Sequence, residues 1–122
     1  TKVSELTSLT GMPLTVLFLD NTNVTDLSPL KGMSILRLSL RNTKISDLSP
    51  LKGMKIARLM IAGSEVHDLS PLKGMSLYYL DLTPSNVAVG MDIIRGMTTL
   101  EDINNLPPAD FWKKYDAEKR EP

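Results

Sequence analysis

The eight residues Asp-Leu-Ser-Pro-Leu-Lys-Gly-Met occur three times without change, starting at Asp26, Asp47 and Asp68, so the step is 21 residues each time (47 − 26 and 68 − 47). A looser copy spans residues 5–12, and Gly96-Met97 ends a further copy after a step of 22 residues (96 − 74). A fixed period in this range predicts a solenoid in which each repeat packs only on its neighbours. The repeat therefore moves the search for function from catalytic motifs to surfaces.

A second block recurs between these copies and predicts short strands. It reads Leu14-x-x-Leu17-x-Leu19, with counterparts that begin at Ile35, Ile56 and Leu77. Its alternation predicts a strand with one face inward, and we expect successive strands to stack in parallel about 4.8 Å apart. We expect further apolar residues to join this inward face at Val24, Ile45, Val66 and Val87, and in the repeated string at Leu27, Leu30 and Met33 with their counterparts.

The turns between strands carry residues suited to particular backbone conformations. Ser28-Pro29, repeated at residues 49–50 and 70–71, is a helix-start pattern in which serine caps and proline takes the first position. Only a short 3₁₀ segment fits before Gly32, where we expect a left-handed residue. Positive φ is also expected at Asn21, Asn42 and Gly63, and hydroxyls bonded to a neighbouring turn are expected at Thr22, Thr43, Ser64 and Ser85.

The pattern Leu-x-x-Leu-x-Leu-x-x-Thr-x-Ile/Val over 21 to 22 residues resembles the short, bacterial, internalin-like leucine-rich repeat, from about Val3 to Leu106. The resemblance implies an α/β solenoid: a right-handed horseshoe segment with short parallel β-strands on the concave side and turns or 3₁₀ segments on the convex side. It also implies protein binding, usually through the concave face. Thr or Ser replaces the usual Asn, so a hydroxyl ladder is expected in place of an asparagine ladder.

The two ends of the chain depart from the repeat. Val3 is in register with Val24, so we expect an array of about four and a half repeats over residues 1–106 that starts inside a repeat of a longer protein. Pro84 predicts a different path for the fourth turn. Residues 107–122 predict a capping helix and tail, with Phe111, Trp112 and Tyr115 on one side. This tail resembles the end of repeat arrays in bacterial serine/threonine kinases and related multidomain proteins, although kinase motifs are absent.

Composition and charge disfavour several classes of function. Fourteen basic and fourteen acidic residues cancel, so no net field attracts nucleic acid or an anionic membrane. No apolar run is long enough to span a bilayer. The chain has no cysteine and one histidine, His67, placed in a turn, so a histidine triad or a two-histidine metal centre cannot be built. We therefore expect neither an enzyme nor a bound cofactor or metal; the cellular compartment stays open.

Two rows of charged residues have alternative interpretations. The acidic row suggests calcium, but we expect each carboxylate to accept hydrogen bonds from backbone N–H groups of its own turn. The basic row suggests phosphate binding, but a solvated ridge is the preferred interpretation because acidic residues lie alongside. The acidic row comprises Glu5, Asp26, Asp47 and Asp68, and the basic row Lys31, Lys52, Lys73 and Arg95.

The concave face is the preferred candidate site. Its outward strand positions differ at every turn and combine Arg, Met and aromatic side chains, which interfaces favour. They are Val16, Phe18, Arg37, Ser39, Arg58, Met60, Tyr79 and Asp81, continued by Asp102 and Asn104 and flanked by Asp20, Arg41 and Tyr78. The sequence thus predicts a non-enzymatic module of a larger bacterial protein that binds a protein or peptide. The alternative is a structural spacer whose uncapped first turn, with Leu6, Leu9 and Leu14, stacks on upstream repeats or self-associates.

Overall fold

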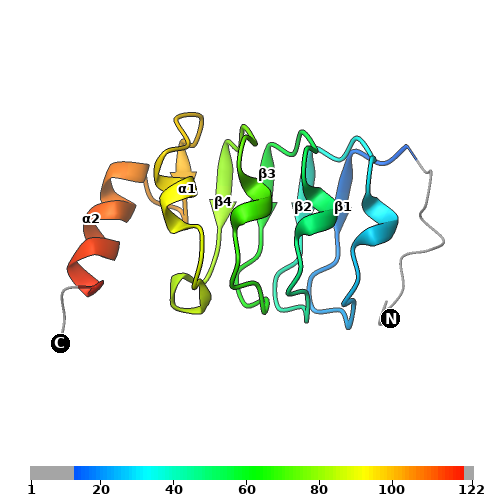
Figure 1. Cartoon of the computed structure of the whole chain (residues 1–122), viewed down its shortest axis with the longest axis horizontal. Coiled ribbons are helices and arrows are strands. Elements are labelled where there is room, and N and C mark those ends of the chain that lie inside the picture. The colour runs from blue at the N-terminus through cyan, green and yellow to red at the C-terminus, as the bar shows by residue number, and fades with distance from the viewer. Residues whose placement is uncertain (1–12, 120–122) are drawn as a thin grey trace.

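Parallel strands line one side of the molecule and short helical turns line the other (Figure 1). The computed structural model describes residues 13–119, without the side chain of Lys119. One sheet runs β1-β2-β3-β4-β5 in chain order, and every pair is parallel. Its strands are β1 (Val16–Phe18), β2 (Arg37–Ser39), β3 (Arg58–Met60), β4 (Tyr79–Asp81) and β5 (Asp102–Ile103). The 3₁₀ helices are η2 (Ser28–Leu30), η3 (Ser49–Leu51), η4 (Ser70–Leu72) and η5 (Pro84–Asn86), and the α-helices are α1 (Met91–Arg95) and α2 (Pro108–Lys119).

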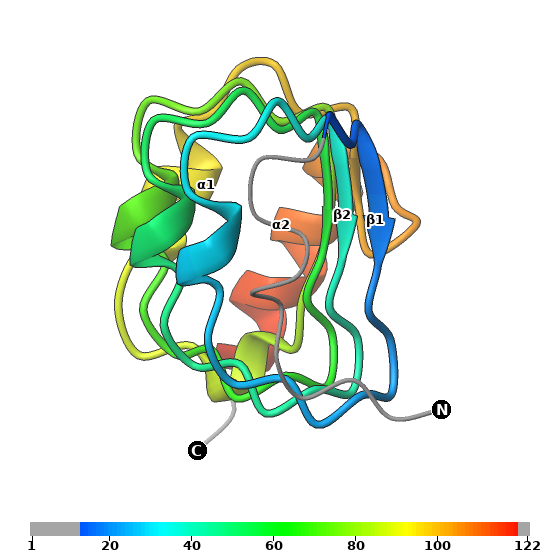
Figure 2. The ribbon, with the colours of Figure 1, turned by 90° about the vertical axis from the view of Figure 1, so that its right-hand side faces the viewer.

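The apolar core fills the space between the sheet and the helical turns (Figure 2). Register pairing aligns Leu17, Leu38, Leu59 and Leu80, so each inward leucine stacks on the one before it. Leu38, Leu59 and Leu80 are fully buried. The predicted core is confirmed at Val24, Ile45 and Val66, which are buried, whereas Val87 is only partly buried.

The predicted backbone conformations at the turns are confirmed. Asn21 has φ 61°, Asn42 has φ 57° and Gly63 has φ 76°. These residues follow the strands, where the chain must leave the sheet, and their types adopt positive φ at low cost. Gly32, Gly53 and Gly74 also have positive φ, at 79°, 80° and 83°, two residues after the ends of η2, η3 and η4. The same residue types therefore produce the same two turns in each repeat.

Two expectations about the turns are wrong. The hydroxyl groups donate within their own turn and not to a neighbouring one: Thr22 Oγ1 to Leu19 O (2.7 Å), and Thr43 and Ser64 likewise to the carbonyls of Leu40 (2.8 Å) and Ile61 (2.6 Å). Ser85 is exposed, and Asn86 Nδ2 donates across the turns to Ser64 O instead (3.3 Å). Serine also does not cap the 3₁₀ helices; an aspartate two residues earlier accepts from the Ser28, Ser49 and Ser70 backbone N–H groups.

The fourth turn takes a different path, as the proline predicts. Pro84 begins η5, and α1 then replaces the 3₁₀ helix of the earlier repeats. Gly90 precedes α1 with φ 106°, and a Cβ at this position would lie 2.7 Å from Leu69 Cβ. Only glycine fits there without displacing Leu69, because both the backbone angle and the space exclude a side chain.

Helix α2 lies over the C-terminal end of the array (Figure 1). Phe111 is 4% exposed within the core cluster, and Trp112 and Tyr115 pack against that cluster. Arg95 of α1 holds the helix from outside: its guanidinium lies 4.4 Å from the Trp112 ring centroid, and Nη2 lies 2.5 Å from Asp116 Oδ1. Helix α2 thus shares the core of the repeats. The division of the chain into a repeat array, residues 1–106, and a cap with tail, residues 107–122, stays a prediction.

Candidate functional site

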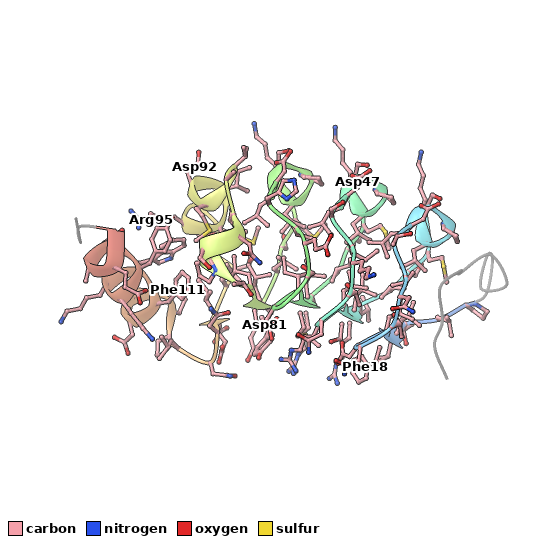
Figure 3. All side chains as sticks on the ribbon, turned by 90° about the horizontal axis from the view of Figure 1, so that it is seen from below. Phe18, Asp47, Asp81, Asp92, Arg95 and Phe111 are labelled. Atoms are coloured by element: carbon pink, nitrogen blue, oxygen red, sulfur yellow. The ribbon has the colours of Figure 1, made fainter. Side chains whose placement is uncertain are left out.

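The eight predicted site residues form two rows across the outer surface of the sheet. In the first row, Val16, Arg37, Arg58 and Tyr79 are register partners; in the second row, Phe18, Ser39, Met60 and Asp81 are register partners. We call this surface, with the residues that directly flank the strands, the strand face. Figure 3 shows Phe18 and Asp81 on the opposite side of the molecule from Asp47, which lies among the helical turns.

The exposed part of the strand face is apolar at β1 and basic at β2 and β3. Phe18 is 60% exposed and Val16 is 45% exposed, although both are large apolar side chains. Arg37 is exposed, and Arg58 is half-buried. Met60 and Tyr79 are also half-buried, and the Tyr79 hydroxyl donates to Asn105 Oδ1 (3.1 Å). The N-terminal part of the face therefore presents bare apolar surface beside positive charge.

Two predicted site residues are not exposed, which corrects the sequence-based expectation. Ser39 is 2% exposed and Asp81 is 7% exposed. The Ser39 hydroxyl donates to Asp20 Oδ1, and the same oxygen accepts from the Arg41 backbone N–H (3.0 Å). Asp81 Oδ1 accepts from the Ala62 backbone N–H (3.1 Å). These polar side chains are buried because partners in adjacent repeats satisfy them, so they form the floor of the face.

An ion pair ties together repeats that are not sequence neighbours. Arg41 Nε donates to Asp81 Oδ2 (2.6 Å), and Arg41 Nη2 lies 2.5 Å from the same oxygen. The hydrogen bond to Asp81 raises the pKa of Arg41, although partial desolvation acts in the opposite direction. The contact joins the C-terminal end of β2 to the C-terminal end of β4, and it therefore holds β2, β3 and β4 together at these ends. The charged groups of Arg41 and Asp81 therefore bind each other.

Sequence alternation missed Leu36, which is 48% exposed beside β2. The backbone N–H groups of Leu36 (2.7 Å) and Arg37 (3.1 Å) both donate to Thr15 O, so two successive N–H groups face the same carbonyl. The same doubling occurs at Ala57 and Arg58, and again at Tyr78 and Tyr79. This shared acceptor departs from the alternation of a regular strand, and Leu36 and Tyr78 stay at the outer surface beside Arg37 and Tyr79. Tyr78 is consequently 44% exposed, and the Arg58 guanidinium lies 5.5 Å from its ring centroid.

The acidic row on the turn side serves the backbone, as expected. Asp26, Asp47 and Asp68 accept from the backbone N–H groups two residues later at 2.8, 2.9 and 2.9 Å. Hydrogen bonds from the backbone and hydroxyl of the following serine lower the pKa of each of these carboxyl groups. Glu5, the fourth member, lies outside the described residues. Within residues 13–118, no group of three or more His, Cys, Asp and Glu side chains is arranged to hold a metal ion.

The basic row is not uniform. Lys31, Lys52 and Lys73 are exposed on the turns, but Arg95 contacts Trp112 and Asp116 and so belongs to the attachment of α2. His67 is exposed in its turn, as its position predicts. Neither α-helix of the described region has the length and apolar character needed to cross a membrane.

Solved structures similar to this chain include two proteins from Listeria monocytogenes. Internalin C2 superposes with a TM-score of 0.76 and 26% identity over 84% of this chain, and internalin F with a TM-score of 0.57 and 24% identity over 84%. The matches cover 47% and 38% of those proteins, so the chain spans less than half of either. No protein-family model and no curated protein matches the sequence. The predicted fold is confirmed: the chain is an internalin-like leucine-rich-repeat solenoid with a C-terminal helix.

Proposed function

We propose that this internalin-like solenoid is a non-enzymatic module of a larger bacterial protein, and that it recognises a protein or peptide through its strand face. The fold supports a protein-interaction role, because the solved structures that it resembles are internalins. A repeat array also offers an extended surface whose shape is held by the core beneath it. The proposed contact residues are the exposed or half-buried ones: Val16, Phe18, Leu36, Arg37, Arg58, Met60, Tyr78 and Tyr79.

The distribution of exposed apolar side chains carries this proposal. Among the described residues, the large apolar side chains left exposed are Val16, Phe18, Leu36, Tyr78 and Val89. All of them except Val89 lie on the strand face: Val16 and Phe18 on β1, Leu36 directly before the neighbouring strand β2, and Tyr78 directly before β4. Clustered exposed apolar surface with arginine beside it is typical of protein interfaces.

A structural spacer is the alternative role. It would place its binding surface at the N-terminal end of the array, where Leu6 and Leu9 lie outside the described residues and Leu14 is half-buried. A spacer needs no exposed phenylalanine or paired tyrosines along its sheet, since such side chains favour association in water. The strand-face composition therefore supports recognition over a spacer role.

The test is a peptide-display selection against the immobilised chain, followed by affinity measurement on variants. Phe18→Ser combined with Arg58→Glu removes the exposed ring and reverses a charge without touching the core. Tyr79 is left in place because its hydroxyl bonds to Asn105. We expect the selected peptides to bind this variant at least tenfold more weakly, because truncating interface anchors costs on the order of 1–2 kcal/mol or more.

The matched control is Lys52→Glu, the same charge reversal on an exposed turn residue. It should retain full affinity. Equal binding by the wild type and the strand-face variant would overturn the proposed site, and self-association of the chain in place of peptide binding would favour the spacer role.

A further inference from the structure

Two arginines lie side by side at the centre of the strand face. Arg37 of β2 and Arg58 of β3 are direct register partners, so their backbones are about 4.8 Å apart. No carboxylate in the described part of the chain lies within 4.0 Å of either guanidinium. Arg58 instead lies beside the Tyr78 ring, at 5.5 Å from its centroid.

Like charges directly opposite each other on neighbouring strands repel. Burial of the arginine side chains does not offset this repulsion, since both reach the surface and Arg37 is exposed. The other positions of this row, Val16 and Tyr79, carry no such charge. A pair of guanidinium groups held together without a counter-charge is complementary to one anionic group placed between them.

Asp20, Asp81 and Asp102 of the strand face already accept hydrogen bonds elsewhere, whereas the exposed Glu101 flanks β5, which β4 separates from Arg58. Asp20 accepts from the Ser39 hydroxyl and the Arg41 backbone N–H. Asp81 is buried and paired with Arg41. Asp102 of β5 accepts from the Asn105 backbone N–H (2.7 Å), and β4 separates it from Arg58. Within the described residues, neither arginine therefore has a counter-charge at ion-pair distance, and an external anion can supply one.

We infer that the partner segment is acidic, with one carboxylate seated between Arg37 and Arg58 and an apolar side chain seated on Phe18. This inference deepens the proposed recognition function and rests on it. Phe18 and Val16 lie on β1, the strand next to Arg37, so the apolar and cationic parts adjoin. Leu36, Met33 and Met54 line a hollow of about 230 Å³. This hollow extends the apolar surface to the loops that precede β2 and β3. Charge complementarity favours a carboxylate-bearing peptide over a neutral one.

Two synthetic hexapeptides test the inference, each acetylated and amidated. One alternates glutamate with phenylalanine; the other replaces every glutamate with glutamine, which has the same size and no charge. Binding is followed by NMR, with the arginine Nε–H signals as the reporters. We expect the glutamate peptide to bind at least tenfold more tightly and to shift the signals of Arg37 and Arg58, because hydrogen bonds between charged groups are the stronger class.

The variant pair separates this site from general charge effects. Arg37→Gln with Arg58→Gln should abolish the preference for the glutamate peptide, whereas Lys52→Gln with Lys73→Gln removes the same charge from the turns and should preserve it. The arginine variant should melt at the same temperature as the wild type or higher at low salt, because like-charge repulsion is removed.

Several outcomes overturn the inference. Equal affinity for the two hexapeptides would do so, as would loss of the preference in the lysine variant. If inorganic phosphate bound Arg37 and Arg58 as tightly as the glutamate peptide does, the two arginines would form a site for a small anion and not for a peptide. If display selection returns neutral peptides whose binding requires Phe18 and Arg58, the recognition function is supported and the inference of an acidic partner is wrong. If no peptide depends on the strand face, both fail.

Discussion

The turn side and the strand face of each repeat differ in how much they vary. On the turn side, the residues before η2, η3 and η4 have nearly identical backbone angles: φ −94°, −94° and −96°, with ψ 2°, 3° and 5°. On the strand face, the same register position holds Val16, Arg37, Arg58 and Tyr79 in turn. The turns repeat because their leucines share one core and their aspartates serve the same backbone N–H groups. The exposed outward strand positions are free of that constraint.

The difference teaches where to look for function in a repeat protein. Leu30, Leu51 and Leu72 are fully buried at equivalent positions, so any change there alters the stacking of neighbouring turns. Exposed strand positions contribute little to stacking, and selection for binding can change them one at a time. The comparison predicts large stability effects on the core and turn side and small ones on the strand face.

The largest effect is expected at Leu59, which is fully buried in β3. Leu59→Ala should lower the free energy of unfolding by about 2–5 kcal/mol, since it removes packed methyl groups and leaves a cavity. Urea unfolding monitored by circular dichroism measures this. Leu36→Ala is the control, because Leu36 is 48% exposed beside the same sheet, and it should change stability by about 0.5 kcal/mol or less. Equal losses would contradict the division between core and face.

The next largest losses of stability are expected at two glycines of the turns. Gly53→Ala meets open space but keeps φ 80°, so it should cost about 1–2 kcal/mol. Gly90→Ala has φ 106° and places Cβ 2.7 Å from Leu69 Cβ, so overpacking should add about 1–3 kcal/mol. Urea unfolding of both variants checks the order. A larger loss at Gly53 would show that the close approach to Leu69 does not control the fourth turn.

A smaller effect is expected from the acidic row. Its carboxyl groups have lowered pKa values in the fold, so their stabilisation is present above the unfolded-state pKa of about 3.9 and is lost as pH falls through the folded values. Stability should therefore decrease below about pH 4. Asp26→Asn, Asp47→Asn and Asp68→Asn together keep an acceptor oxygen without the titration, so the urea midpoint of this variant should depend less on pH. An unchanged pH dependence would contradict the capping role.

The fold could be predicted from the sequence because local chemistry repeats. Each repeat places glycine or asparagine where φ is positive and leucine where the core lies, and neither requirement depends on distant residues. Ser39 and Asp81 could not be predicted as buried, because their partners are Asp20 and Arg41, 19 and 40 positions away (39 − 20 and 81 − 41). Leu36 was missed because strict alternation does not anticipate two successive N–H groups donating to Thr15 O. These three exceptions arise from contacts between repeats.

The most direct test of the central claim measures stability and binding on one strand-face variant. Val16→Ser, Phe18→Ser, Arg37→Gln and Arg58→Gln together replace exposed or half-buried side chains on β1 to β3 and leave the inward leucines unchanged. We predict that the free energy of unfolding stays within about 2 kcal/mol of the wild type, because each of the four substitutions on the surface should cost no more than about 0.5 kcal/mol. Binding of the display-selected peptides should be lost. Retained binding, or a variant that no longer folds, would contradict the account.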